Sequence, residues 1–384
     1  MPTTRWLIIV CVASVFNFPT QLLPLMRIVL VRRGYSPTGG AERYLCRLAD
    51  TLANTGHQPD LVTSENWPKS AWQHGEIHRL PGKNPLVFAE ALQQLVPTLN
   101  GDRLVSLERV WACDAYRAGD GVHAAWLDRR AAYESPWKSH FRRWQTKHRM
   151  LLQLESALFS GAAGRIIVNS KMVAEEISQY YHTPAEKIHL VYNGYDLPSV
   201  HTPPADNTSP AAIKRAYGIP EDATMVLFTG SGWERKGLAH AIAALKMLKH
   251  PKVHLLVAGV GKTRAEYRHS HVHFCGPVQD MPPLLRAADV FILPTLYDPF
   301  SNACLEAACH GLPVITTDAN GCAEILTEGI HGSITRPGDI AALSAALEFW
   351  ASPGRAAAAK SVCALNAARF SMAANVEATI KALL

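Results

Sequence analysis

The feature that most constrains the fold is a regular alternation, from Met26 onward, of short apolar runs with longer amphipathic stretches. The short runs have the length of strands and the longer stretches that of helices, so the pattern predicts βαβ units and a parallel sheet. Apolar residues make up 48% of the chain and charged residues only 18%, which favours well-buried α/β packing over disorder. The first part of the chain is predicted to hold strands at 27–31, 58–63, 77–80, 103–107, 165–169 and 188–192, with helices at 41–56 and 171–181.

The alternation is interrupted by DLPSVHTPPADNTSP (residues 196–210), whose proline, serine and aspartate content is typical of a linker. A chain of 384 residues is too long for one ordinary core, so we predict two doubly wound, Rossmann-like domains facing across a cleft. Ligands of such sheets bind outside the carboxyl ends of the strands, here between the domains. The second part is predicted to hold strands at 224–229, 253–258, 272–275, 290–293 and 314–316, and helices at 237–249, 302–310 and 340–350. The predicted units are an N-terminal extension (1–25), a first Rossmann-like domain (26–197), a linker (198–210), a second Rossmann-like domain (211–368) and a helix packing back toward the first domain (369–384).

The first 25 residues include RWLIIVCVASVF, one basic residue followed by an apolar run that resembles a short signal-peptide core. The run is short for a bilayer span. Met26 then opens MRIVLVRRGYSPTGG, which reads like the natural start of a domain. We therefore interpret residues 1–25 as an upstream extension, with an N-terminal membrane anchor as the alternative.

Two glycine-containing turns follow predicted first strands. In GYSPTGGAERY (34–44), Gly39 and Gly40 allow a ligand to approach the backbone, and the following helix offers free N–H groups to an anion. The same pattern also describes an ordinary turn. In FTGSGWERKGL (228–238), Gly230 permits a tight turn, and Arg235 and Lys236 place two cations where they can neutralise a diphosphate, unless they are simply a solvated pair.

A third stretch, YDPFSNACLEAACHGLPVIT (297–316), places Asp298 and Glu306 around the start of a predicted helix, which we expect to begin near Pro299. The free N–H groups of that helix favour phosphate. Asn302 and Glu306 share one helix face, and Glu306 lies among apolar residues, where a carboxylate needs a partner. The alternative is a helix cap at Asp298 and a surface residue at Glu306.

Together these motifs, with VYNGYD (191–196) and DVFILPT (289–295), resemble the retaining GT-B glycosyltransferases of family 4 from Met26 to Leu384. The resemblance implies sugar transfer from a nucleotide donor, with the acceptor bound by the first domain (26–197) and the nucleotide sugar by the second (211–368). It also implies that Asp298 lies at the donor hexose, Glu306 at the ribose, and Arg235 and Lys236 at the diphosphate. The family's E-x7-E pattern is D-x7-E here, and the shorter Asp298 leaves the donor sugar open. The predicted donor-binding residues are Gly39, Gly40, Gly230, Arg235, Lys236, Asp298, Phe300, Ser301, Asn302, Ala303 and Glu306.

The stretch RAGDGVHAAWLDRR (117–130) is similar to the middle of the lipopolysaccharide core glucosyltransferases. That likeness implies that Asp120 and His123 line the reacting end of the cleft, and with Arg235 and Lys236 they form the predicted catalytic set. A core or surface role for His123 is the alternative. No D-x-D motif is present, and the alternating histidines of HSHVHF (269–274) do not by themselves make a complete metal site, so we expect no metal and no cofactor.

A basic, aromatic stretch, WKSHFRRWQTKHRMLLQLESALF (137–159), is predicted to be a helix with aromatics beside a basic face. Such a helix suits an anionic bilayer, although it can equally pack its aromatics on the first domain. The predicted membrane-binding residues are Trp137, Lys138, Phe141, Arg142, Arg143, Trp144, Lys147 and Arg149.

The resemblance predicts a retaining, metal-independent enzyme that moves glucose from UDP-glucose to a heptose of the lipopolysaccharide inner core. Alternatives are another donor sugar acting on O-antigen, capsule or another glycolipid, and an inactive nucleotide-sugar-binding, membrane-associated protein. We expect a monomer without nucleic-acid partners, bound peripherally at the cytoplasmic face of the inner membrane, because nucleotide sugars are made in the cytoplasm.

Overall fold

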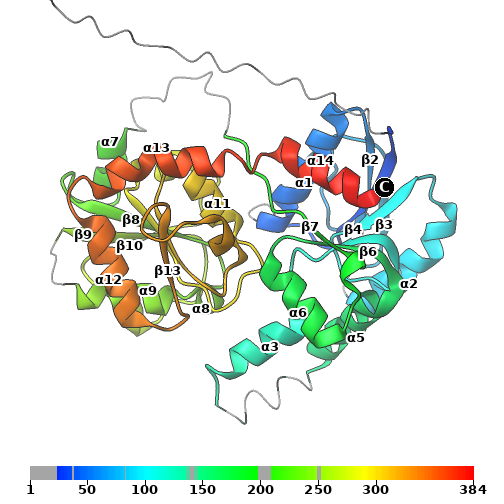
Figure 1. Ribbon diagram of the computed structural model, residues 1–384, viewed down its shortest axis with the longest axis horizontal. Coiled ribbons are helices and arrows are strands. Elements are labelled where there is room, and N and C mark those ends of the chain that lie inside the picture. The colour runs from blue at the N-terminus through cyan, green and yellow to red at the C-terminus, as the bar shows by residue number, and fades with distance from the viewer. Residues whose placement is uncertain are drawn as a thin grey trace, which may run out of the picture.

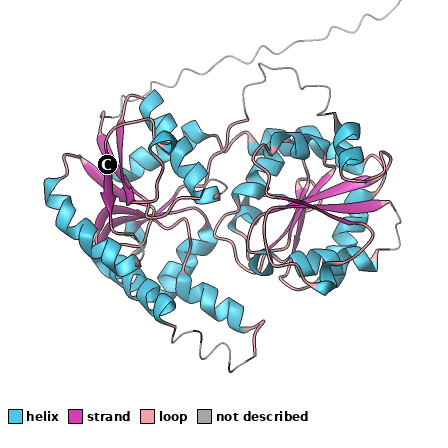
Figure 2. Ribbon diagram, turned by 180° about the vertical axis from the view of Figure 1, so that it is seen from behind, coloured by secondary structure: helices cyan, strands magenta, loops and turns pink. Residues whose placement is uncertain are grey.

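The computed structural model describes residues 24–36, 39–82, 84–135, 137, 142, 145–197, 209–248 and 252–384. Two α/β domains lie side by side, each a sheet covered by helices on both faces (Figures 1 and 2). In the described part of the chain, one sheet has seven strands in the order β3-β2-β1-β4-β5-β6-β7 and the other has six in the order β10-β9-β8-β11-β12-β13. All described pairs are parallel, as the predicted βαβ units require.

The N-terminal domain contains strands β1 (Arg27–Val31), β2 (Gln58–Ser64), β3 (Ile77–Leu80), β4 (Arg103–Ser106), β5 (Cys113–Arg117), β6 (Ala163–Val168) and β7 (Ile188–Leu190). Its helices are α1 (Gly40–Asn54), α2 (Pro85–Leu95), α3 (His123–Ala131), α5 (Thr146–Ala157) and α6 (Lys171–Tyr181). The sequence did not predict β5 or helices α2 and α3.

The C-terminal domain contains strands β8 (Thr224–Thr229), β9 (Val253–Ala258), β10 (Val272–Gly276), β11 (Val290–Leu293), β12 (Val314–Thr317) and β13 (Gly332–Thr335). Its helices are α7 (Pro210–Ala216), α8 (Trp233–Lys236), α9 (Leu238–Met247), α10 (Pro282–Ala287), α11 (Asn302–Cys309), α12 (Ile340–Ala351) and α13 (Arg355–Ala367).

Burial on both faces explains why the central strands are continuous apolar runs. In β1, Ile28 and Leu30 pack in one core cluster with α1, whereas Val29 and Val31 pack in another with α2 and α6. Successive strand residues point to opposite faces, so a strand covered on both sides needs apolar residues at every position. The same requirement acts on β8 and β9.

Helix α14 (Met372–Leu383) returns to the N-terminal domain after the C-terminal domain is complete (Figure 1). Its residues Met372, Val376 and Ile380 join the core cluster that contains α1. The returning segment runs against the outgoing one, because the Tyr195 N–H donates to the Phe370 carbonyl at 2.9 Å. Gly194 allows this approach, since a Cβ there would lie 2.4 Å from the Ser371 carbonyl oxygen. The two connections between the domains are thus packed together.

Candidate active site

A cleft of about 650 Å³ lies between the domains, at the carboxyl ends of both sheets. The strand orders change direction between β1 and β4 and between β8 and β11, and ligands of doubly wound sheets bind at such points. Of the residues predicted to bind the donor, Gly39 alone does not line the cleft. The residues that do line it are Gly40, Gly230, Arg235, Lys236, Asp298, Phe300, Ser301, Asn302, Ala303 and Glu306, together with Asp120 and His123.

The turn after β8 holds Arg235 and Lys236 in the short helix α8. Left-handed glycines flank that helix: Gly232 has φ 71° and Gly237 has φ 76°. A Cβ at Gly237 would lie 1.9 Å from the Pro294 carbonyl oxygen, so glycine lets the loop after β8 pack directly on the loop after β11. The Thr295 hydroxyl fastens the two loops by donating to the Arg235 carbonyl at 2.9 Å.

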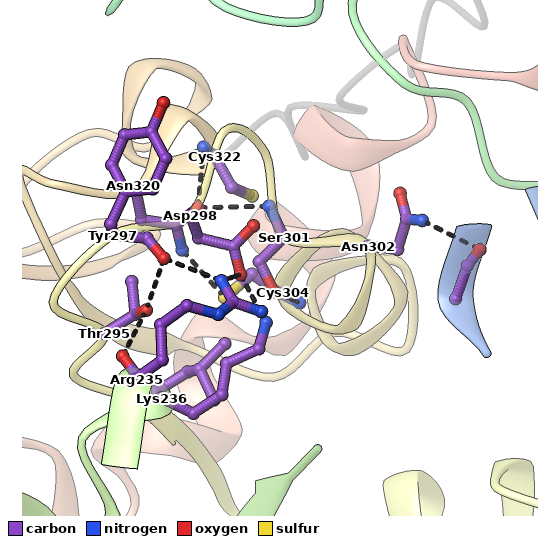
Figure 3. A network of polar contacts seen from close by, with 12 residues as sticks. Arg235, Lys236, Thr295, Tyr297, Asp298, Ser301, Asn302, Cys304, Asn320 and Cys322 are labelled. Carbon is purple, nitrogen blue, oxygen red and sulfur yellow. Dashed lines mark hydrogen bonds and ion pairs between the residues drawn. The ribbon is translucent and has the colours of Figure 1, made fainter. Parts of the chain in front are cut away.

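Both cations converge on Asp298 (Figure 3). The Lys236 ammonium forms a close ion pair with the Asp298 carboxylate, and Arg235 Nη1 lies 3.8 Å from the same oxygen and donates to the Tyr297 carbonyl at 2.7 Å. Burial alone would raise the pKa of Asp298, but Lys236 and Arg235 hold it below its usual value. Two cations therefore face one ionised carboxylate, and the cluster keeps an excess of positive charge.

Helix α11 begins at Asn302, the first residue of the helix predicted at 302–310, and not near Pro299, where the start was also expected. Ser301 is its N-cap, with the side chain accepting from the Cys304 N–H at 3.4 Å, so Asp298 is not the cap. Asn320 fixes the entry to the helix, since its Oδ1 accepts from the Ser301 N–H at 3.1 Å. The free N–H groups at the start of α11 consequently lie at the cleft beside the cationic cluster.

Two side chains on α11 bond across the cleft to the N-terminal domain. Glu306 forms an ion pair with Arg47 at 3.2 Å, and the Arg47 guanidinium lies over the Tyr195 ring. Asn302 accepts from Asn193 Nδ2 at 2.7 Å. The partner that the largely covered Glu306 was expected to need is therefore supplied by the opposite domain.

Further cross-domain contacts involve residues whose roles no sequence motif indicated. The Tyr297 hydroxyl donates to Glu176 at 2.7 Å and accepts from the Val122 N–H at 2.9 Å. Glu324 accepts from the Lys171 N–H at the start of α6, at 2.9 Å. These partners lie far apart in the chain, so no local spacing could have revealed them.

Asp120 and His123 lie at the N-terminal-domain wall of the cleft. Asp120 pairs with Arg32 at 3.3 Å; burial opposes its ionisation, but Arg32 and Arg109 lower its pKa. His123 bonds to His148 at 2.9 Å between ring nitrogens. Burial, Arg109 and His148 lower the pKa of His123 to about 3, so its imidazole is neutral at physiological pH.

A buried ion pair supports this wall. Glu155, which is fully buried, lies 2.8 Å from Arg109 and accepts from the His123 N–H at 2.6 Å. Its other oxygen accepts from the Ala124 N–H and the Tyr181 hydroxyl. Glu155 therefore holds the start of α3, and with it His123, against the sheet. Neither member of this pair was predicted from the sequence.

The predicted basic, aromatic helix is not continuous. Gln145 has an extended backbone (ψ 132°) and precedes α5, so Lys147 and Arg149 lie on a different helix from Trp137, which is 77% exposed. Arg142 is paired with Glu134 at 2.6 Å, and Lys147 lines the cleft. The other predicted membrane residues, Lys138, Phe141, Arg143 and Trp144, lie outside the described residues.

Within the described ranges, no helix combines the length and apolar character needed to cross a bilayer. The histidine-rich stretch forms a stacked cluster in which His254 bonds to His273 at 3.0 Å. No group of three or more His, Cys, Asp or Glu side chains in the described part of the chain is arranged to hold a metal ion.

Comparisons with known proteins agree with this arrangement. Residues 38–198 match the Glycosyltransferase Family 4 model, and residues 223–352 match the Glycosyl transferases group 1 model. The lipopolysaccharide core biosynthesis glycosyltransferase LpsE of Rhizobium meliloti is 31% identical over 324 residues, covering 82% of this chain and 86% of LpsE. The lipopolysaccharide glucosyltransferase WaaG of Escherichia coli is 27% identical over 318 residues, covering 78% of this chain and 82% of WaaG.

Solved structures show the same fold. The crystal structure of WaaG superposes with a TM-score of 0.74 at 23% identity, covering 92% of this chain and 98% of WaaG. HepE from Anabaena, in complex with UDP-glucose, superposes with a TM-score of 0.69 at 18% identity, covering 93% and 98% of the two chains.

Two parallel, doubly wound sheets that face each other across a basic cleft define the GT-B class of glycosyltransferases. Both domains also match glycosyltransferase models, and LpsE is similar along most of its length. The chain belongs to glycosyltransferase family 4 and is related to the lipopolysaccharide core glucosyltransferases.

Proposed function

We propose that the protein transfers glucose from UDP-glucose to a heptose of the lipopolysaccharide inner core, with retention of configuration at the anomeric carbon. The observation that carries the proposal is the cluster of Arg235, Lys236 and Asp298 beside the open end of α11. It supplies both the charge that a diphosphate needs and a carboxylate for sugar hydroxyls. WaaG is a lipopolysaccharide glucosyltransferase, and HepE binds UDP-glucose, which supports this choice of donor and acceptor.

Donor binding exchanges contacts that already exist in the cleft. When Lys236 turns to the diphosphate, Asp298 loses its ammonium partner and its oxygens become free to accept hydrogen bonds from the hexose. Glu306 exchanges Arg47 for the ribose hydroxyls in the same way. The N–H groups at the start of α11 then face the phosphate, where a negative charge is most stabilised.

In the transfer step, the bond between the anomeric carbon and the diphosphate oxygen breaks while the acceptor hydroxyl oxygen bonds to that carbon on the same face. Arg235, Lys236 and α11 stabilise the charge that grows on the leaving diphosphate. The leaving phosphate takes the acceptor proton. A neutral His123 with its strongly lowered pKa is a weak base, so it serves better as a hydrogen-bond partner of the acceptor than as the proton acceptor.

We further propose that the reaction needs no metal, because the two cations and the helix end supply the positive charge. The lipid-linked acceptor places the enzyme peripherally at the cytoplasmic face of the inner membrane, acting as a monomer. The exposed Trp137 and Arg149 support contact with an anionic surface.

A second candidate is transfer of another hexose. It is favoured by Asp298, which reaches about one methylene less than the glutamate of the related E-x7-E pattern and is drawn toward Lys236. A donor hexose with a differently oriented hydroxyl would suit the shorter side chain.

The decisive experiment offers radiolabelled UDP-glucose and other nucleotide sugars, with EDTA present, to core-truncated lipopolysaccharide. We expect label from UDP-glucose alone to enter the acceptor. Glu306→Ala should abolish donor binding and transfer, whereas Lys236→Ala should reduce kcat more than donor affinity. Full activity in both variants, or transfer from a different sugar nucleotide only, would contradict the proposal.

A further inference from the structure

The carboxyl end of β5 carries a buried cation that the proposed mechanism does not use. Arg117 is 2% exposed, lines the cleft and forms no ion pair with any described residue. Its Nη1 nitrogen also lacks a hydrogen-bond partner. A buried guanidinium without a counter-charge destabilises the fold, because the free energy lost on removing the charge from water is recovered only when the charge is paired and fully hydrogen-bonded.

Among the described residues, Arg117 contacts polar groups and an aromatic ring but no carboxylate. Its Nη2 donates to Asn193 Oδ1 at 2.6 Å, and the guanidinium lies 4.5 Å from the centre of the Tyr44 ring. Asn169, at the end of the neighbouring strand β6, also lines the cleft and is 1% exposed. Burial lowers the pKa of Arg117, the direction expected for a cation with little negative charge around it.

Asn169 is the second group with unused bonding capacity. Its Oδ1 has no partner, and its Nδ2 makes only a long bond, 3.4 Å, to the Gly119 carbonyl. Turning the amide over exchanges its oxygen and nitrogen, so Asn169 can offer a donor to the same space. Buried polar groups that remain unpaired in a cleft point to a ligand that pairs with them.

We propose that Arg117, with Asn169 and Asn193, forms a subsite that binds a carboxylate or phosphate group of the acceptor. The inference rests on the proposed function, in which the N-terminal domain holds the acceptor. It adds to that function a substrate class: an acceptor with a negative charge close to the hydroxyl that receives the sugar. A planar guanidinium suits either anion, because both present paired oxygens to its fork of donors.

The position of the subsite explains how it opens. Asn193, which Arg117 holds, bonds across the cleft to Asn302 on α11. Arg117 Nη1 is shielded from solvent in this arrangement. Separation of the domains breaks the Asn193–Asn302 bond and lets an anion enter, and closure then brings the anchored acceptor to the donor side.

A binding experiment tests the subsite without requiring catalysis. Wild-type protein is saturated with UDP, so that the Arg235–Lys236 site is occupied, and inorganic phosphate is titrated at constant ionic strength by calorimetry. A charge-assisted contact is worth about 1.5–3 kcal/mol, so Arg117→Met should weaken phosphate binding by about 10- to 100-fold, while Arg117→Lys should retain part of it. Asn169→Asp should also abolish phosphate binding and raise the melting temperature, because the new carboxylate pairs with Arg117. If Arg117→Met does not fold, Asn169→Asp tests whether phosphate binds at Arg117.

Affinity for UDP identifies which substrate supplies the anion. We expect UDP to bind Arg117→Met within about threefold of wild type; a loss of about tenfold or more would assign Arg117 to the donor diphosphate and overturn the proposal. Equal phosphate binding by wild type and Arg117→Met would overturn it as well.

The kinetics of sugar transfer distinguish whether the acidic group of the acceptor is a phosphate or a carboxylate. With native acceptor extract, Arg117→Met should raise the acceptor KM about tenfold at nearly constant kcat. The acceptor is then treated either to remove its phosphate groups or to amidate its carboxyl groups. One of the two treatments should raise the acceptor KM of the wild type, and neither should change the acceptor KM of Arg117→Met. If neither treatment raises the wild-type KM, the inference is wrong although the enzyme transfers sugar. If wild type transfers nothing, the proposed function fails, and the phosphate titration still decides the subsite.

Discussion

Replacing Glu155 by glutamine should lower the melting temperature of the N-terminal domain considerably. The substitution keeps the shape of the side chain but leaves Arg109, whose side chain is 6% exposed, without a counter-charge. Breaking a buried pair by neutralising one partner costs about 3–5 kcal/mol. With about 2–4 °C per kcal/mol for a domain of this size, the melting temperature should fall by roughly 6–20 °C.

The assay is thermal and urea unfolding of Glu155→Gln followed by circular dichroism and by tryptophan fluorescence. Glu221→Gln provides a matched control, because the Arg215–Glu221 pair has side chains that are 64% and 54% exposed and should contribute about 1 kcal/mol or less. A second control, Tyr181→Phe, removes one hydrogen bond to Glu155 without touching the ion pair and should cost about 1 kcal/mol. If Glu155→Gln loses no more stability than Glu221→Gln, the pair does not hold α3 and the reasoning fails.

Three further results are expected. Arg47→Met frees Glu306 from its ion pair and should strengthen UDP binding by up to about fivefold in calorimetry, since a pair that is still partly open to solvent contributes about 0–1 kcal/mol. Weaker binding would mean that Arg47 contacts the nucleotide. Gly194→Ala places a Cβ 2.4 Å from the Ser371 carbonyl and should destabilise the protein by about 1–3 kcal/mol in urea unfolding; an unchanged midpoint would show that the crossing segments yield easily. The fold lowers the pKa of His123 from 6.5 to about 3, so between these pH values the unfolded chain binds a proton at His123 that the folded chain does not, and the stability of the fold should decrease as the pH is lowered from 6.5 to 3. His123→Gln should therefore lose less melting temperature on acidification than the wild type, and an equal loss would contradict this reasoning.

The sequence was sufficient to predict those helices and strands whose positions are determined by neighbouring residues in the chain. Strand β1 and strand β8 were predicted at their observed bounds, because coverage on both faces makes them unbroken apolar runs. Strand β5 was missed, since its sequence CDAYR contains an exposed aspartate and an arginine that reads as a surface residue until the cleft is seen. Helix α11 starts where the helix predicted at 302–310 starts, but the expectation of a first turn near Pro299 was wrong, because Ser301 supplies the cap.

The same distinction applies to the site. Arg235 and Lys236 could be found because glycines and cations occur together in one short motif after a strand. The partners Arg47 and Glu155 could not, because each is defined by a residue far along the chain: Arg47 by Glu306, and Glu155 by Arg109. Such pairings depend on how the two domains face each other and on how α5 packs, and neither is encoded in a local pattern.

The return of α14 to the first domain has a consequence for biogenesis. A ribosome releases the residues of α14 only after the whole second domain has been synthesised, so the first domain must wait with part of its interior uncovered. For the same reason, expressing the two halves from a cut in the linker should yield an insoluble first half unless the α14 peptide is supplied with it.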